Sequence, residues 1–295
     1  MHTVQTFFDP TTYTLTYVVY DPESRDAVIV DPVLDYDVLG SRTSTLNADK
    51  VIAFAKGKEL QVGWVLETHA HADHLSSSQY LKNQLGAKVA IGARIREVQE
   101  VFKGAFDLPP SFPTDGRQFD RLLADGEVLQ VGSLAVRTIA TPGHTPACVT
   151  FEIGGDLFTG DALFMDDYGT GRCDFPKGSA GALYDSVHGK LYAYPDHTKV
   201  YVGHDYQPNG RALAYETTIG SSKKHNIQLR ADTSKEAFVA AREARDKGLA
   251  APRLLFPSVQ VNIDAGRLPE AHGNGVRYLR IPINLGKTTG DDGAP

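Results

Sequence analysis

Short apolar runs alternate with amphipathic stretches through the first two thirds of the chain. Apolar runs of about four to eight residues bounded by turn-forming residues are typical of strands. Residues 47–60 place Val51, Ile52 and Ala55 on one face, which predicts a helix. Further helices are expected at residues 74–85 and 93–102. We expect strands at residues 15–20, 27–30, 62–68, 88–91, 128–131, 134–140, 149–153 and 157–159.

This alternation predicts an α/β protein in which stacked sheets are covered by helices. The pattern changes after about residue 210, where Thr233 and Glu236 have the spacing of a capping box before an amphipathic stretch that ends near Gly248. We therefore expect a main domain at residues 1–210 and a helical C-terminal extension at residues 211–295 that contributes to the substrate pocket. The last ten residues, 286–295, are expected to be disordered.

Composition and charge exclude several classes of protein. The 295 residues are 41% hydrophobic and 22% charged, which is ordinary for a globular chain and excludes intrinsic disorder. A net charge of −6 argues against a nonspecific nucleic-acid binder. Only two cysteines, Cys148 and Cys173, are present, so neither a disulfide framework nor a multi-cysteine metal site is available. Without a membrane-spanning run or a targeting segment, we expect a cytoplasmic protein.

The segment THAHADH at residues 68–74 carries the chemistry. His69 and His71 alternate by two at the end of an expected strand, so both side chains can point the same way. Asp73 and His74 follow on the turn into the next helix. Imidazole and carboxylate groups together suit zinc, iron or manganese. Four potential metal ligands therefore lie within six residues.

Three single candidates occupy similar positions later in the chain, each after an apolar run and each preceded by glycine. They are His144, Asp161 and His204. Glycine lets the backbone turn sharply and bring each side chain to a shared site. A lone histidine is usually a surface or core residue, but this compound pattern favours a metal site.

These seven residues resemble the ligand set of the metallo-β-lactamase superfamily, and the resemblance runs from about residue 10 to residue 210. It implies an αββα sandwich with metal at one edge between the sheets, so that residues 1–210 would form the catalytic domain. In dinuclear members, the resemblance implies His69, His71 and His144 around one metal. It implies Asp73, His74 and His204 around the second metal, with Asp161 bridging.

The segments GDALF at 160–164 and GTGRCDF at 169–175 resemble the persulfide dioxygenase family. Glyoxalase II, a relative, has GKFYEG where this chain has GRCDF. The resemblance implies one Fe(II) per chain, held by His69, His144 and Asp161. Such a face leaves positions open for substrate and O2. His71, Asp73, His74 and His204 would then orient ligands or water.

The reaction that this resemblance implies converts glutathione persulfide, O2 and water to glutathione and sulfite. Glutathione carries two carboxylates, so cationic anchors are expected near the site. By comparison with glyoxalase II, Arg172 and Tyr206 are expected to contact the substrate. The basic run at residues 221–230 adds Lys223 and Arg230 as candidates, although it fits a solvated helix face equally well. We expect no nucleic-acid or membrane partner, and a homodimer or homotetramer.

Other activities stay open at this point. The seven filled positions also permit hydroxyacylglutathione hydrolysis at a dinuclear site, where a bridging hydroxide would attack the thioester. GRCDF argues against that activity. A lactonase is a weaker alternative. A non-catalytic metal or glutathione sensor is a further possibility, and binding without turnover would favour it.

Overall fold

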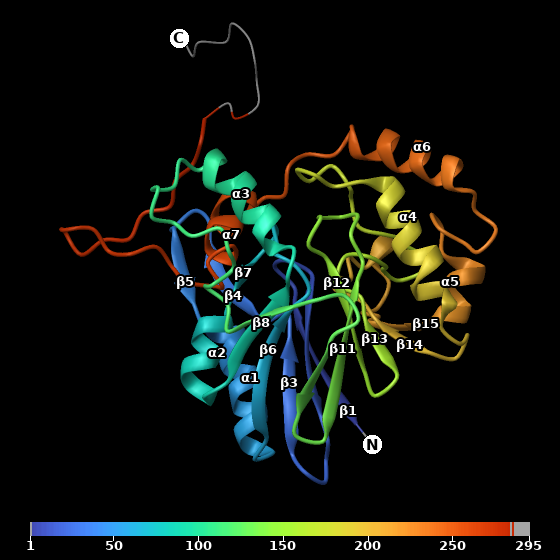
Figure 1. Ribbon diagram of the computed structural model, residues 1–295, viewed down its shortest axis with the longest axis horizontal. Helices are drawn as coiled ribbons and strands as arrows, with labels where there is room; N and C mark the ends of the chain where they lie inside the picture. Colours follow the sequence, from blue (N-terminus) through green and yellow to red (C-terminus); the bar gives the residue numbers. More distant parts are fainter. Residues whose placement is uncertain (1, 284, 286–295) are drawn as a thin grey trace, which may run out of the picture.

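Two six-stranded sheets lie face to face, and helices cover their outer faces (Figure 1). The structure is a computed structural model that describes residues 2–283 and 285. The first sheet has the order β1-β2-β3-β6-β8-β9 and the second the order β10-β11-β12-β13-β14-β15. The strands of the first sheet are β1 (Thr3–Asp9), β2 (Thr14–Tyr20), β3 (Asp26–Val30), β6 (Gln61–Glu67), β8 (Lys88–Gly92) and β9 (Arg121–Leu123). Those of the second are β10 (Val128–Val131), β11 (Leu134–Ala140), β12 (Val149–Ile153), β13 (Asp156–Phe158), β14 (Lys199–Tyr201) and β15 (Glu216–Thr218).

The helices lie on the two outer sides of this sandwich. On the side of the first sheet lie α1 (Leu46–Gly57), α2 (Ser78–Leu85), α3 (Ile95–Ala105) and α7 (Leu255–Asn262). On the side of the second sheet lie α4 (Ala180–Gly189), α5 (Ile219–His225) and α6 (Lys235–Asp246). Two 3-10 turns, η1 (Leu191–Ala193) and η2 (Pro208–Gly210), complete the helical elements of the described residues.

Strand β2 is buried on both faces, and its sequence is therefore a continuous apolar run. Tyr17 and Val19 are buried in the core between the two sheets, together with Phe151 of β12. Val18 points the other way, into the core that the first sheet shares with Val51 and other residues of α1. Because both faces of the strand are covered, the polar alternation of a solvent-facing strand is lost.

A third, small sheet with the order β5-β4-β7 changes one predicted boundary. It consists of β4 (Val33–Asp37), β5 (Arg42–Ser44) and β7 (Leu75–Ser76). The sequence predicts a helix over residues 74–85, but Leu75 and Ser76 pair with β4 and the helix begins only at Ser78. The first residues of the predicted helix are thus used to fix the histidine segment before it.

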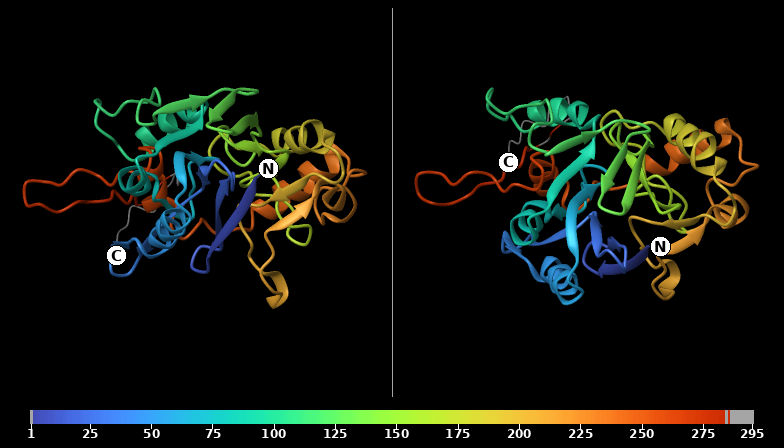
Figure 2. Two further views of the ribbon diagram at one scale, coloured as in Figure 1. Left: turned by 90° about the horizontal axis from the view of Figure 1, so that it is seen from below. Right: turned by 60° about the horizontal axis from the view of Figure 1, so that its bottom comes forward.

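The C-terminal part is not a separate helical layer. The expected boundary at residue 211 precedes β15, which pairs with β14 and completes the second sheet. Helix α6 lies over the second sheet and α7 packs on the first-sheet side, so the chain crosses the molecule between them (Figure 1). The N-cap of α6 is Ser234, whose hydroxyl accepts a hydrogen bond from the Ala237 N–H, rather than the expected Thr233. The segment around residues 268–281 extends away from the body (Figure 2).

The sequence also predicts a disordered tail at residues 286–295 and no membrane-spanning segment. The segment 286–295 lies outside the described residues. Within the described part, no helix combines the length and the apolar character needed to cross a bilayer.

Candidate active site

The seven candidate ligands meet where strands of both sheets end. His69, His71, Asp73 and His74 follow β6 of the first sheet, and His144 follows β11 of the second. Asp161 and His204 follow β13 and β14, which are parallel neighbours and therefore end at the same edge. The five histidines and Asp161 are buried, and Asp73 is partly exposed. Residues as far apart as 69 and 204 thus share one site.

Gly160 allows the turn that brings Asp161 to this edge. Its φ of 49° lies in the left-handed region, and a Cβ there would lie 2.4 Å from the Thr68 hydroxyl oxygen. The position therefore requires glycine, because any side chain would push apart β13 and the histidine segment.

His69, His144 and Asp161 form one close group of donors. One ligand atom from each lies within 4.8 Å of the others. His144 Nε2 lies 3.5 Å from Asp161 Oδ2, and the His69 and His144 rings meet edge to face at 5.0 Å. This trio has two imidazoles and one carboxylate, the donor set of a mononuclear non-heme iron site.

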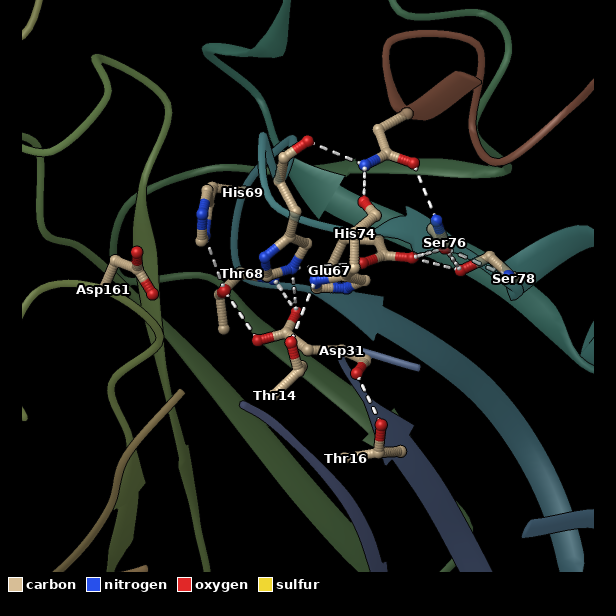
Figure 3. A network of polar contacts seen from close by, with 12 residues as sticks. Thr14, Thr16, Asp31, Glu67, Thr68, His69, His74, Ser76, Ser78 and Asp161 are labelled. Carbon is tan, nitrogen blue, oxygen red and sulfur yellow. Dashed lines mark hydrogen bonds and ion pairs between the residues drawn. The ribbon is translucent and has the colours of Figure 1, made fainter. Parts of the chain in front are cut away.

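In both histidines of this trio, a hydrogen bond at Nδ1 determines which ring nitrogen carries the proton. Thr68 donates its hydroxyl to Asp31 at 2.7 Å and so accepts from His69 Nδ1 at 3.0 Å (Figure 3). His144 Nδ1 donates to the Arg172 carbonyl at 2.6 Å. Both rings therefore present an unprotonated Nε2 to the shared space. Burial also lowers the pKa of His69 well below its usual value, which keeps the ring neutral.

His71 is held differently, between two buried carboxylates. Its Nε2 lies 3.0 Å from Asp31 Oδ1 and 3.6 Å from Glu67 Oε2. Glu67 is fixed in turn by hydroxyl groups of Ser76 and Ser78 (Figure 3). Burial opposes a charge on His71, but Asp31 and Glu67 outweigh it and raise the pKa well above its usual value.

The remaining three residues connect to the trio through Asp161. His204 Nε2 lies 3.3 Å from Asp161 Oδ1 and 3.5 Å from Asp73 Oδ2. Asp73 also lies 3.1 Å from His74 Nδ1. Burial disfavours a charged His204, but the two carboxylates outweigh burial and raise its pKa to about 9. His71, Asp73 and His74 form a second group with ligand atoms within 4.8 Å of one another.

Orphaned buried atoms show that the donors fit a metal ion. A buried polar atom without a partner is costly, and natural proteins rarely keep one without a reason. Within the described part of the chain, His69 Nε2, His71 Nδ1 and His74 Nε2 have no hydrogen-bond partner. His71 Nε2, His204 Nε2 and Asp161 Oδ1 have only the imidazole–carboxylate contacts given above. Neutral imidazole and carboxylate are ligands for divalent transition metals, so a cation would satisfy these atoms together.

Asn262 at the end of α7 is a site residue that the sequence does not reveal. Its amide donates to the carbonyls of His71 and His74, both at 2.8 Å. Its oxygen accepts the Ser76 N–H at 2.8 Å. One buried side chain from the C-terminal part therefore fixes the loop that carries four candidate ligands. A single Asn gives no signal in the sequence, and neither do Asp31 and Glu67.

A cavity of about 490 Å³ opens beside the candidate ligands. Arg172 and Tyr206 line it, as the comparison with glyoxalase II implies. Lys223 and Arg230 do not line it, and they pair instead with Asp196 at 2.7 Å and Asp232 at 3.0 Å. Cavity residues that no sequence motif indicates are Tyr13, Tyr36, Phe164, Tyr168, Arg242, Arg245, Leu249 and Arg253.

Helix α6 fixes the loop behind His144. Arg242 and Asp246 form a buried ion pair on this helix. Arg242 donates to the Thr170 carbonyl at 3.3 Å, and Asp246 accepts the Cys173 N–H at 2.8 Å. These contacts hold the segment whose Arg172 carbonyl accepts from His144, so α6 acts on the trio through one hydrogen bond.

Cys173 itself is suited to packing. The side chain is buried, and burial raises the pKa of its thiol well above the usual value. A thiol that resists ionisation is a poor nucleophile, so the geometry gives Cys173 no catalytic role.

Comparisons with known proteins agree with this geometry. The model of the "Metallo-beta-lactamase superfamily" matches residues 10–204. A probable metallo-hydrolase from Burkholderia pseudomallei is 48% identical over 292 residues, which cover 96% of this chain and 99% of the relative. The mitochondrial persulfide dioxygenase ETHE1 of Bos taurus is 35% identical over 262 residues, with 88% and 87% covered. The crystal structure of ETHE1 from Myxococcus xanthus has a TM-score of 0.72 at 31% identity and covers 90% of this chain and 100% of that chain.

Proposed function

Because the chain belongs to the metallo-β-lactamase superfamily, in the branch that includes the ETHE1 persulfide dioxygenases, we propose that it is a non-heme Fe(II) persulfide dioxygenase. The family and the αββα fold expected from the sequence are confirmed. The proposed reaction is glutathione persulfide plus O2 plus water to glutathione plus sulfite. The outer sulfur loses four electrons, O2 accepts them, and the sulfur–sulfur bond breaks.

A complete set of two histidines and one carboxylate carries this proposal. His69, His144 and Asp161 form a compact trio, whereas His71 is drawn toward Asp31 and Glu67. The two carboxylates face Nε2 of His71, so only its Nδ1 is free of them. The trio by itself supplies the ligands of one metal per chain, with His71, Asp73, His74 and His204 around it.

Bound Fe(II) would supply open coordination positions and an accessible redox change, which zinc lacks. His69 and His144 would hold it through Nε2. Burial opposes ionisation of Asp161, but the neighbouring His204 outweighs it and lowers the pKa of the carboxyl, so an anionic oxygen is available at neutral pH. Phe164, Tyr168 and Tyr206 provide an apolar wall of the cavity, which limits water around a reacting persulfide.

Hydroxyacylglutathione hydrolysis at a dinuclear site is the second candidate. The orphaned nitrogens of His74 and His204 favour it, because they would ligate a second metal. A relative that is 48% identical and named a probable metallo-hydrolase supports the same alternative. The two candidates differ in metal stoichiometry and in their need for O2.

The deciding experiment measures O2 consumption by the iron-loaded protein after addition of glutathione persulfide, with sulfite assayed in the same vessel. We expect one mole of sulfite per mole of O2 and one iron per chain. Asp161→Asn and His144→Ala should abolish uptake. Lys56→Ala, which changes an exposed cation in the last turn of α1, is the control and should leave uptake unchanged.

One result would contradict the dioxygenase proposal. If protein verified to hold Fe(II) consumes no O2 but hydrolyses S-lactoylglutathione with two metals per chain, the dioxygenase proposal is wrong. Binding of glutathione without turnover of either compound would favour the sensor.

Two expectations about the surroundings of the protein stay predictions. They are a cytoplasmic location and assembly into a homodimer or homotetramer.

A further inference from the structure

A hairpin arm, residues 268–278, extends from the body of the molecule (Figure 2). Its two strands meet at an antiparallel bridge between Ala271 and Arg277, and the His272 N–H donates to the Val276 carbonyl at 2.9 Å. A two-stranded hairpin without further packing is at best marginally stable in water. Such an arm gains stability when a partner packs against it.

Both ends of the arm are anchored to the body. Before the arm, the Arg267 guanidinium donates to the Gln118 carbonyl at 3.0 Å. After it, Leu279 packs on a small buried cluster, and the Arg280 N–H donates to the side-chain oxygen of Gln260 at 2.8 Å. The arm is therefore held away from the body at a defined place.

Apolar side chains gather in the arm and directly after it. The exposed large hydrophobic residues there are Leu268, Val276, Tyr278, Ile281, Ile283 and Leu285. Soluble monomers rarely keep such a group of side chains in water, and a contact with another protein is a common reason for one. The surface of the arm therefore indicates a protein interface.

A groove of about 440 Å³ lies beside the arm. Its wall is formed partly by the arm residues Leu268 and Arg277 and partly by the body, which contributes Thr43 and Tyr80. A two-fold axis can pair a projection and a recess that adjoin on one molecule, because each copy then offers its arm to the groove of the other. Arm and groove are thus arranged for self-association.

The arm and the edge of the groove carry opposite charges that lack ionic partners. Arg277 donates to the Pro269 carbonyl within the arm and has no carboxylate partner among the described residues. Asp49 accepts the hydroxyl groups of Tyr80 at 2.8 Å and Thr45 at 2.7 Å, which both line the groove. No cation pairs with Asp49 in the described part of the chain. Both charged side chains are exposed, so each is accessible to a second copy.

We propose that the arm and the groove form a two-fold interface between two copies of this chain, with the arm of each copy in the groove of the other. The apolar side chains of the arm leave water there, and Arg277 of each copy meets Asp49 of the other. This contact gives the expected homodimer a defined interface, and it does not depend on the reaction at the candidate ligands.

Charge reversal tests this interface by sedimentation of the full chain at a series of concentrations. The wild type should be dimeric. Arg277→Asp and Asp49→Arg each place like charges in both symmetric contacts, and each should weaken the dimer roughly ten-fold or more. Lys247→Asp reverses an exposed cation at the end of α6, on the side of the second sheet, and should leave the dimer unchanged.

A mixture of the two variants distinguishes a contact between copies from one within a copy. In a dimer of one Arg277→Asp chain and one Asp49→Arg chain, both contacts have opposite charges again. The mixture should therefore form a dimer with an affinity within about three-fold of the wild type. A pair within one chain would be restored only in the double variant Arg277→Asp/Asp49→Arg, and that pattern would contradict the interface.

Tyr278→Ser tests the apolar part of the contact on the exposed arm, where the substitution leaves the body unchanged. It should also weaken the dimer, because it removes an aromatic ring from the interface. A wild type that sediments as a monomer at every concentration would overturn the inference. So would a dimer that is insensitive to all three substitutions. Neither result bears on the dioxygenase proposal, which O2 uptake decides.

Discussion

Gly171 shows how closely one backbone position controls a candidate ligand. A Cβ at this position would lie 2.3 Å from the Asp161 carbonyl oxygen and 3.1 Å from the Asp161 Cβ. The Gly171 N–H also donates to the same carbonyl at 3.1 Å. The obstruction is backbone, which cannot rotate away as a flexible side chain would.

Gly171→Ala should therefore displace Asp161 and weaken metal binding about ten-fold or more, the size of effect seen when groups that orient a ligand are lost. The iron content per chain, measured after dialysis against a weak chelator, reports the change in metal affinity. Gly104→Ala is the matched control, because its site in α3 has no heavy atom within 4 Å. It should keep full iron content and gain roughly 0.5–1 kcal/mol of stability from helix propensity. Full iron content in Gly171→Ala would contradict the role assigned to Gly171.

A sequence reveals site residues when several metal-binding side chains lie close together along the chain. His69, His71, Asp73 and His74 are visible because four donors lie within six residues of an apolar run. Asp31 and Glu67 touch the same histidines, but single acidic residues are common and their partners are set by sheet pairing. Lys223 and Arg230 illustrate the opposite case, since a basic run does not say which way its side chains point.

At the scale of elements, α7 is attached to the histidine loop through its last residue. Asn262 uses both amide hydrogens and its oxygen on the backbone of residues 71–76. The side chain is buried, so no water replaces these bonds when they are broken.

Asn262→Asp keeps the shape of the side chain but replaces two donors by an anionic oxygen. Two buried carbonyls then lose their partners and face a negative charge, so we expect the free energy of unfolding to fall by about 3 kcal/mol or more. Urea denaturation of the metal-free protein measures the change. Asn83→Asp, an exposed position on α2, is the control and should change stability by less than about 0.5 kcal/mol. If both variants unfold at the same urea concentration, Asn262 does not hold the loop.

Some element boundaries were predictable from the period of apolar residues. The expected helix at residues 47–60 corresponds to α1 at Leu46–Gly57. The expected helix at 74–85 loses its first turn to β7, because the β4 partner at Val33 and Leu34 is distant in sequence. Helix α7 was not expected at all, since its residues are buried on nearly every side and show no amphipathic period.

At the scale of the whole molecule, the candidate ligands join the two sheets. His69 comes from the first sheet, whereas His144 and Asp161 come from the second. A metal held by all three would therefore connect the two halves of the sandwich. A ligand that binds only the folded state stabilises it by an amount set by its concentration and affinity.

Removing the metal should consequently lower the melting temperature. At free metal one hundred times the Kd, the stabilisation is about 2.7 kcal/mol, or roughly 4 °C for a chain of this length. Calorimetric scans with Fe(II) under argon, with and without a chelator, test this expectation. The double variant His69→Ala/His144→Ala should melt at one temperature in both scans. A wild type that is equally insensitive to the chelator would show that the trio binds no metal tightly.

Part of the cavity wall comes from a different stretch of chain than the metal ligands. The ligands end the strands of the sandwich, whereas Arg242, Arg245 and Arg253 come after residue 240. Natural or laboratory selection can thus alter the C-terminal segment and change which small molecule enters the cavity, while the candidate metal ligands are inherited intact. The same separation makes this segment the place to introduce new specificity by design.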